Sequence, residues 1–275
     1  MVDTPQIVKS NGLSNEAIRA NMAGSPASEL RIEVEQEIDS TNAALKRRAV
    51  SEDIHGLALF AEAQTAGRGR LGRPWVSPPK SNIYMSLGWR TDLEPLELAG
   101  LSLAVGCAIA EGLEGDLALD LKLKWPNDLY LGGKKCGGVL IDLVQSAKQD
   151  WIIVVGVGLN VAMSESGGTD IDQPWTDLGS HTDIPVVRNE LAGRLLEALV
   201  PLLSSWQVGA FSQWQSCWAR RDLMACHQIS VQQGGHTISG RAEGVDLSGA
   251  LQVATRDGLI VVQSGEASML RSQEL

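Results

Sequence analysis

Short apolar stretches, many of them alternating with polar residues, run through this 275-residue chain. They predict buried or half-buried β-strands at residues 57–61, 83–87, 119–125, 136–141 and 151–161. Wider apolar patterns predict helices at residues 43–48, 96–113, 189–206 and 211–222. Ser40 or Thr41 can cap the first helix, and Pro201 should kink or break the third. The pattern indicates an α+β protein with a mixed sheet and helices packed on one face.

A different pattern begins at about residue 223. Four or five short strands follow within about 50 residues, separated by Gly234-Gly235 and Asp257-Gly258 turns. This spacing predicts a small β-barrel. We therefore expect a short N-terminal segment at residues 1–30, a catalytic domain at 31–222 and a barrel at 223–275.

Composition and charge narrow the possible functions. The formal net charge is −10, from 23 Lys and Arg against 33 Asp and Glu, which argues against binding nucleic acid over the whole surface. The four cysteines lack the spacing of a zinc site and should be reduced. The first twelve residues contain no apolar signal-peptide core, and the longest apolar stretch, residues 98–110, is too short to span a membrane. We expect a soluble, cytoplasmic protein that binds no membrane.

A loop rich in glycine and arginine, residues 67–73, is the first candidate for chemistry. It matches the G-x-G-x-x-G pattern of dinucleotide sites, but Pro74 and the Ser77-Pro78-Pro79 segment prevent the helix that such sites require. A P-loop is excluded because Gly-Lys-Ser/Thr is missing. The three arginines can bind phosphate oxygens through paired hydrogen bonds, although a solvated basic turn would look the same.

Two further segments carry polar residues at strand ends. A hairpin from residue 124 to residue 141 should bring Asp128 and Lys135 close together. Lys124 and Lys134 are expected to point into solvent from the strand face. Asn160 ends an apolar strand, and its side-chain amide could contact the edge of an adenine ring.

Taken together, these segments resemble the biotin protein ligase family in order and spacing. The matching segments are residues 39–42, 64–73, 124–130, 135–141 and 156–160, with 244–251 and 265–268 resembling the family's small C-terminal domain. The resemblance implies a mixed-sheet catalytic domain followed by an SH3-like barrel. Leu71 departs from the arginine of some members, and Cys136 occupies a variable position. Only about 30 residues precede the first matching strand, too few for a winged helix, so the resemblance implies a ligase without a DNA-binding arm.

The resemblance also implies a two-step reaction. ATP, with Mg²⁺ expected on its phosphates, converts biotin into biotinoyl-5′-AMP, and a lysine of the biotin carboxyl carrier protein or domain of acetyl-CoA carboxylase then captures the biotinoyl group. No DNA partner is expected, and the protein is expected to be a monomer or a homodimer.

By resemblance, each site residue receives a role. The catalytic residues would be Lys135, Arg70 and Asp128. The residues that bind biotin would be Ser40, Thr41, Asn42, Gln64, Arg68, Gly69, Arg70, Trp75, Lys135, Gly137 and Gly138. The residues that bind ATP or AMP would be Arg68, Arg70, Arg73, Asn127 and Asn160. Asp128 could orient Lys135 or help to deprotonate the incoming amine, the metal ligands stay undetermined, and the loop 163–183 is expected to be a mobile flap over the nucleotide.

Three rival functions fit parts of the sequence. A lipoate or octanoate transferase would share the fold, but the Gly/Arg loop has the ligase form. A biotin-sensing regulator or pure binding module is disfavoured because no winged helix is expected. An adaptor built on the C-terminal barrel would leave some 200 preceding residues without a role.

Overall fold

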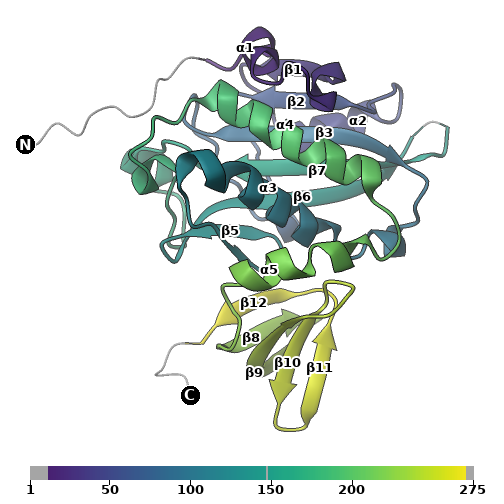
Figure 1. The fold of residues 1–275 in the computed structure, drawn as a ribbon, viewed down its shortest axis with the longest axis vertical. Helices are drawn as coiled ribbons and strands as arrows, with labels where there is room; N and C mark the ends of the chain where they lie inside the picture. The colour runs from purple at the N-terminus through teal and green to yellow at the C-terminus, as the bar shows by residue number, and fades with distance from the viewer. Residues whose placement is uncertain (1–11, 147, 271–275) are drawn as a thin grey trace, which may run out of the picture.

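The computed structural model describes residues 12–146 and 148–270. The expectation that the chain begins without a signal peptide therefore concerns residues almost wholly outside the described part. A seven-stranded sheet forms the centre of the molecule, with the strand order β1-β2-β3-β7-β6-β5-β4 (Figure 1). The strands are β1 (Arg31–Glu35), β2 (Leu57–Ala61), β3 (Ile83–Thr91), β4 (Lys122–Lys124), β5 (Asp128–Leu131), β6 (Lys134–Gln145) and β7 (Trp151–Leu159). β1 and β2 are parallel and all other neighbours antiparallel, so the sheet is mixed, as predicted.

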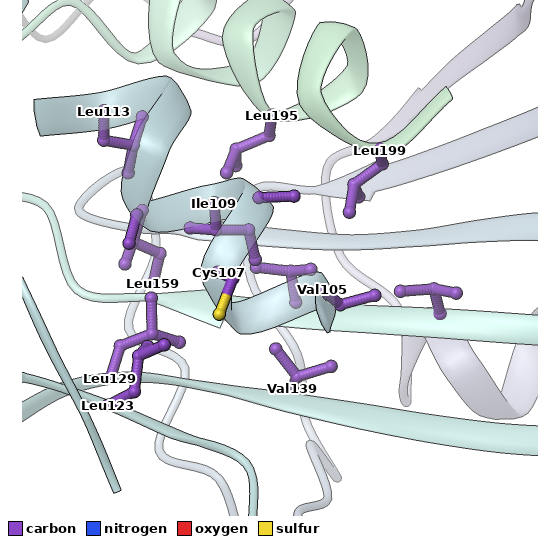
Figure 2. Packing of buried hydrophobic residues seen from close by; sticks show 14 of the residues in the cluster. Val105, Cys107, Ile109, Leu113, Leu123, Leu129, Val139, Leu159, Leu195 and Leu199 are labelled. Atoms are coloured by element: carbon purple, nitrogen blue, oxygen red, sulfur yellow. The ribbon is translucent and has the colours of Figure 1, made fainter. Parts of the chain in front are cut away.

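Two long helices cover one face of this sheet. Figure 2 shows α3 (Leu101–Leu117) between α4 (Arg188–Ser205) and the strands, with Leu195 above Ile109 and with Val139 and Leu159 below. All four side chains belong to one large apolar cluster. Because successive strand residues point to opposite faces, the same strands also present apolar side chains to the other face.

The short helix α2 (Thr41–Arg48) packs on that second face. The sequence predicted helices on one face only, so α2 is an addition to that prediction. Leu45 of α2 forms a smaller apolar cluster with Leu57, Leu59 and Val154. Ser40 caps the helix, as predicted, by accepting a hydrogen bond from the N–H of Ala43. The α2 face is therefore only partly covered, and the rest of it is open to a ligand.

Several helix boundaries differ from the sequence prediction. The predicted helix at 96–113 is a 3₁₀ turn, η3 (Pro95–Leu98), followed by α3, because Gly100 takes a φ of +80° and leaves no room for a Cβ beside Phe211. α4 continues through Pro201 to Ser205 without a break. The predicted helix at 211–222 is the 3₁₀ turn η6 (Ala210–Gln213) and the helix α5 (Gln215–Arg221).

One segment of the described chain, 95–115, is long and apolar enough by composition to cross a membrane, with a mean hydropathy of 1.6. It consists of η3 and most of α3, and α3 is the central helix of the large apolar cluster. Packing inside the core accounts for its apolar composition.

The residues before β1 pack into the same core. α1 (Asn15–Ala20) and the 3₁₀ turn η1 (Pro26–Glu29) lie beside α4, and Ile18 and Met22 are completely buried. A buried ion pair joins Glu62, just after β2, to Arg188 of α4 at 2.7 Å. The buried apolar residues between 12 and 30 thus belong to the main core.

A second sheet follows α5, with all neighbouring strands antiparallel in the order β11-β10-β9-β8-β12. Its strands are β8 (Gln228–Gln233), β9 (His236–Val245), β10 (Leu251–Thr255), β11 (Gly258–Val262) and β12 (Glu266–Met269). The predicted turns at Gly234-Gly235 and Gly258 have positive φ angles. The indole N–H of Trp125 donates to the carbonyl of Gly249 at 3.1 Å and so joins the two sheets.

Candidate active site

A cavity of about 620 Å³ opens on the α2 face of the large sheet. Three glycines, Gly138 of β6 and Gly156 and Gly158 of β7, leave this part of the sheet without side chains. A Cβ at Gly158 would lie 2.6 Å from the Trp75 ring, and one at Gly156 would lie 2.3 Å from Oδ1 of Asn42. The glycines therefore allow a tryptophan and an asparagine to pack directly on the strands.

One end of the cavity is a network of uncharged polar groups. The Thr41 N–H donates to Oε1 of Gln64 at 2.9 Å, and Nε2 of Gln64 donates to Oγ of Ser77 at 3.0 Å. The hydroxyl of Ser86, from the centre of β3, lies 2.8 Å from Oγ1 of Thr41 and 2.5 Å from Oδ1 of Asn42. Such short, fixed donors and acceptors suit a polar ring that must have every group paired.

The Gly/Arg loop folds over the cavity as a short hairpin. The N–H of Trp75 donates to the carbonyl of Gly67 at 2.9 Å, and the N–H of Gly69 donates to the carbonyl of Arg73 at 2.8 Å. At the tip, Leu71 and Gly72 have φ angles of +55° and +74°. No helix begins in the loop beyond one 3₁₀ turn, η2 (Arg70–Gly72), which agrees with rejecting a dinucleotide site.

The three loop arginines have different surroundings. Arg68 is exposed and makes no ion pair within the described residues, while Arg73 pairs with Glu266 of the second sheet. Arg70 donates from Nη1 to the carbonyl of Gly265 at 3.4 Å. Burial lowers the pKa of Arg70, and the nearby Asp128 opposes that shift.

The predicted pairing of Lys135 with Asp128 is confirmed. Nζ of Lys135 lies 2.7 Å from Oδ1 of Asp128, and both side chains are mostly buried. The ammonium also lies 5.5 Å from the centroid of the Trp75 ring. The backbone N–H of Lys135 donates to Pro174 and its carbonyl accepts from Thr176, so the loop after β7 fixes this lysine at the cavity.

Lys124 corrects a sequence prediction. It was expected in solvent, but it lines the cavity, and burial lowers its pKa while Asp128 opposes the shift. Its Nζ lies 5.8 Å from the centroid of the Tyr130 ring. Alternation along a strand predicts which face a residue occupies but not whether another part of the chain covers that face. Lys134 is exposed, as expected.

All but one of the predicted site residues lie around this cavity. They are Ser40, Thr41, Asn42, Gln64, Arg68, Gly69, Arg70, Arg73, Trp75, Asn127, Asp128, Lys135, Gly138 and Asn160. The exception is Gly137, which does not line the cavity, because a Cβ there would lie 2.9 Å from Leu159 Cδ1 and 3.4 Å from Leu129, both in the large core. Its predicted place beside biotin is therefore wrong.

Two predicted nucleotide contacts, Asn127 and Asn160, each donate one side-chain N–H to the backbone. Nδ2 of Asn127 donates to the carbonyl of Val139 at 2.7 Å, and Nδ2 of Asn160 donates to the carbonyl of Thr176 at 3.0 Å. These bonds fix strand ends and the loop after β7. Each amide nitrogen carries a second N–H, and both residues line the cavity, so their contacts with the nucleotide stay predictions.

The loop predicted as a mobile flap is anchored at several points. Asp177 accepts hydrogen bonds from the N–H groups of Met163 and Ser180, both at 2.9 Å. Asp170, Asp172 and Trp175 of this loop line the cavity. The indole N–H of Trp75, on the other side of the cavity, is buried without a hydrogen-bond partner among the described residues, as expected of a donor that meets a ligand.

Charge distinguishes this cavity from the rest of the protein. Five cationic side chains line it: Arg68, Arg70, Arg73, Lys124 and Lys135. Four carboxylates also line it: Asp128, Asp170, Asp172 and Glu266. The cavity thus has a surplus of one positive charge in a chain of net charge −10, and an anion with an apolar or uncharged polar extension is the ligand that it suits.

Known protein families match both sheets. Residues 34–160 match the biotin/lipoate A/B protein ligase family, and residues 227–270 match the biotin protein ligase C-terminal domain. The bifunctional ligase/repressor BirA of Salmonella typhimurium is 38% identical over 86% of this chain and 73% of its own length. The biotin–[acetyl-CoA-carboxylase] ligase of Mycobacterium tuberculosis is 33% identical over 94% of this chain and 96% of its own.

Solved structures agree. The biotin protein ligase of Aquifex aeolicus, in complex with biotin and ATP, superposes with a TM-score of 0.74 and 31% identity. The match covers 88% of this chain and 99% of that protein. With both sheets matched and the cavity lined by the residues expected of such an enzyme, the chain belongs to the biotin protein ligase family.

Proposed function

We propose that the cavity carries out a two-step ligation. In the first step, biotin carboxylate attacks the α-phosphate of ATP, which forms biotinoyl-5′-AMP and releases pyrophosphate. In the second, the amine of a lysine in the biotin carboxyl carrier domain of acetyl-CoA carboxylase attacks the acyl carbon, the bond to AMP breaks, and the amine loses a proton. The observation that carries the proposal is the group of five cations beside a polar, glycine-floored slot.

The first step brings a carboxylate to a polyphosphate, so the main barrier is repulsion between negative charges. Arg68, Arg70 and Arg73 extend from the Gly/Arg loop and can bind phosphate oxygens through paired hydrogen bonds. Lys124, from the strand beneath, adds a fourth positive charge. We assign these four side chains to the phosphates of ATP.

The uncharged end of the cavity holds the biotin rings. Thr41, Asn42 and Gln64 present hydroxyl and amide groups, and Ser86 fixes two of them from the sheet. Trp75 forms one wall and offers its free indole N–H. Ser86 was not predicted from the sequence, although a lone serine in the apolar strand 83–87 is a usable signal.

Lys135 is placed for both steps. Held by Asp128, its ammonium can neutralise the biotin carboxylate as it approaches phosphate, and later the acyl-phosphate oxygen as AMP leaves. Asp128 already holds an ammonium at 2.7 Å, so we assign it to orienting Lys135 rather than to accepting the proton of the incoming amine.

Mg²⁺ on the ATP phosphates remains part of the proposal. In residues 12–146 and 148–270, no group of three or more His, Cys, Asp or Glu side chains could hold a metal ion on its own. Mg²⁺ commonly binds through phosphates, waters and only one or two carboxylates. Asp170 and Asp172 line the cavity and would be its protein ligands, with the ion supplying further neutralisation of phosphate charge.

We further propose that the protein works in the cytoplasm, as a monomer or homodimer, and without binding DNA or a membrane. The acceptor in the names of two relatives, acetyl-CoA carboxylase, supports the cytoplasmic location. Four free cysteines agree with a reducing compartment. The net charge of −10 supports the absence of DNA binding.

Transfer of labelled biotin to an apo biotin carboxyl carrier domain tests the proposed function. We expect covalent label that requires both ATP and the acceptor lysine. Lipoate serves as the competing substrate, and thermal shifts with biotin and with lipoate show which ring the slot accepts. Stabilisation by lipoate alone, with lipoate transferred to a carrier domain, would contradict the proposal.

A further inference from the structure

A carboxylate just outside the cavity ends the hydrogen-bond network of its uncharged end. Asp142 of β6 does not line the cavity, but its Oδ2 accepts from Nδ2 of Asn42, which does, at 3.0 Å. The other carboxylate oxygen, Oδ1, lies 3.3 Å from Nζ of Lys46 in α2. Asn42 and Asp142 are 100 residues apart in the sequence, so only the folded sheet brings this carboxylate to the network.

The carboxylate orients the side-chain amide of Asn42. A carboxylate in an ion pair accepts hydrogen bonds and cannot donate them, so the amide must turn its nitrogen toward Asp142. The carbonyl of Leu140 also faces this nitrogen, but at 3.5 Å it is too distant to hold the amide strongly. The amide oxygen, Oδ1, is therefore turned toward Ser86 and can only accept.

This orientation passes through Ser86 to Thr41. The Ser86 hydroxyl lies 2.5 Å from Oδ1 of Asn42 and 2.8 Å from Oγ1 of Thr41, but it has one hydrogen to donate. Because the Asn42 oxygen can only accept, that hydrogen belongs to the bond with Asn42. The Ser86 oxygen then accepts from the Thr41 hydroxyl, which lies closer to it than to Oε1 of Gln64, at 3.3 Å.

The Thr41 hydroxyl is left with an acceptor for a ligand. Its hydrogen points to Ser86, so the free lone pairs of Oγ1 can pair only with a donor. The neighbouring amide is fixed as well, because the backbone N–H of Thr41 donates to Oε1 of Gln64 at 2.9 Å. Thr41 and Gln64 both line the cavity. An N–H group is thus the ligand group that Thr41 suits, and a group that only accepts would leave it unpaired.

We propose that Asp142 is a positioning residue that sets the direction of these hydrogen bonds, so that Thr41 presents an acceptor to a ring N–H of the substrate. The inference rests on the proposed function, because the ureido ring of biotin carries N–H groups and the dithiolane ring of lipoate carries none. Without the carboxylate, the Asn42 amide can turn over and donate to Ser86. Ser86 would then donate to Thr41, and Thr41 would offer the ligand a hydrogen in place of a lone pair.

Isothermal titration of biotin into the full-length protein tests this role. We expect Asp142→Ala to bind biotin roughly 3- to 10-fold more weakly, because the hydrogen bond from the ring N–H to Thr41 is lost. The matched control is Lys46→Met, which breaks the same ion pair but leaves the carboxylate on Asn42, and which should bind biotin as the wild type does. An equal loss in both variants, or no loss in Asp142→Ala, would overturn the proposal.

A double-mutant cycle shows whether the effect passes through the network. Ser86→Ala removes the hydroxyl that joins Asn42 to Thr41. We expect Asp142→Ala to weaken biotin binding much less in the Ser86→Ala background than in the wild type. Fully additive losses would mean that Asp142 acts by another route and would overturn the proposal. Thr41→Val gives a second cycle with the same expectation, which decides the question even where Ser86→Ala does not fold.

Steady-state kinetics separate this role from a general loss of structure. Asp142→Ala should raise the KM for biotin while the KM for ATP and kcat stay near their wild-type values, because the network meets the rings and not the phosphates. A parallel rise in the KM for ATP would overturn the positioning role. Wild-type protein that binds no biotin would contradict the proposed function and this inference with it, whereas normal binding by both wild type and Asp142→Ala would overturn this inference alone.

Discussion

The pair formed by Asp128 and Lys135 makes the sharpest prediction about the chemistry. Asp128→Asn keeps the shape of the side chain and removes its charge. The lost interaction is a charge-assisted hydrogen bond of 2.7 Å, in which the Lys135 side chain is 15% exposed and the Asp128 side chain 16%. Such bonds contribute about 1.5–3 kcal/mol. If all of it acts in the transition state, the rate falls roughly 10- to 150-fold.

The two half-reactions separate the possible roles of Asp128. Pyrophosphate release without acceptor measures adenylation, and single-turnover reaction of purified biotinoyl-AMP with apo carrier domain measures transfer. Because Asp128 orients a lysine that acts in both steps, we expect Asp128→Asn to slow both by similar factors. Asp120→Asn is the control, since it breaks an Asp–Lys pair of 2.8 Å with Lys122 outside the cavity. Normal adenylation with slow transfer would refute our assignment and make Asp128 the proton acceptor.

Three further predictions address other parts of the cavity. Arg70→Gly should still form biotinoyl-AMP but release it, so that lysines of bystander proteins become biotinylated; strict specificity for the carrier domain would contradict the role of this arginine. Since burial lowers the pKa of Lys124, its ammonium loses its proton at a lower pH than that of an ordinary lysine, and the KM for ATP should rise in that alkaline range. Lys124→Arg should remove this rise. The same dependence of KM on pH in Lys124→Arg and wild type would argue against phosphate binding by Lys124. Gly158→Ala should displace Trp75 at a cost of about 1–3 kcal/mol, and isothermal titration should then record roughly 5- to 150-fold weaker biotin binding. The control is Gly115→Ala, whose added Cβ has no atom within 4 Å and which should bind biotin normally.

Local patterns were enough to predict most of the fold. Alternating and apolar segments located the strands of the large sheet, and glycine turns located the hairpins of the second. The pattern did not reveal that α2 lies on the opposite face from α3 and α4, because a helix of eight residues carries little information about its packing partner. Gly100 likewise delayed the start of the predicted 96–113 helix to Leu101, through a close approach to Phe211 that has no local sequence signal.

The sequence predicted the site best for residues whose contacts lie within a single hairpin or loop. Lys135 and Asp128 lie on the two strands of one hairpin, so the turn between the strands was enough to predict that their side chains meet. Lys124 and Glu266 were missed as site residues because their environment depends on contacts between distant segments. Gly137 was predicted on the wrong face of its strand. Successive strand residues point to opposite faces, so Gly137 faces the core while its neighbour Gly138 lines the cavity.

Retention of the reaction intermediate tests the central claim most directly. The enzyme is incubated with biotin and ATP labelled in the α-phosphate, without acceptor, and then separated rapidly from free nucleotide. We expect label to remain on the protein as biotinoyl-AMP, at up to one equivalent per chain, and to be discharged as AMP when the apo carrier domain is added. Label that never remains bound, or that remains without biotin, would contradict the account.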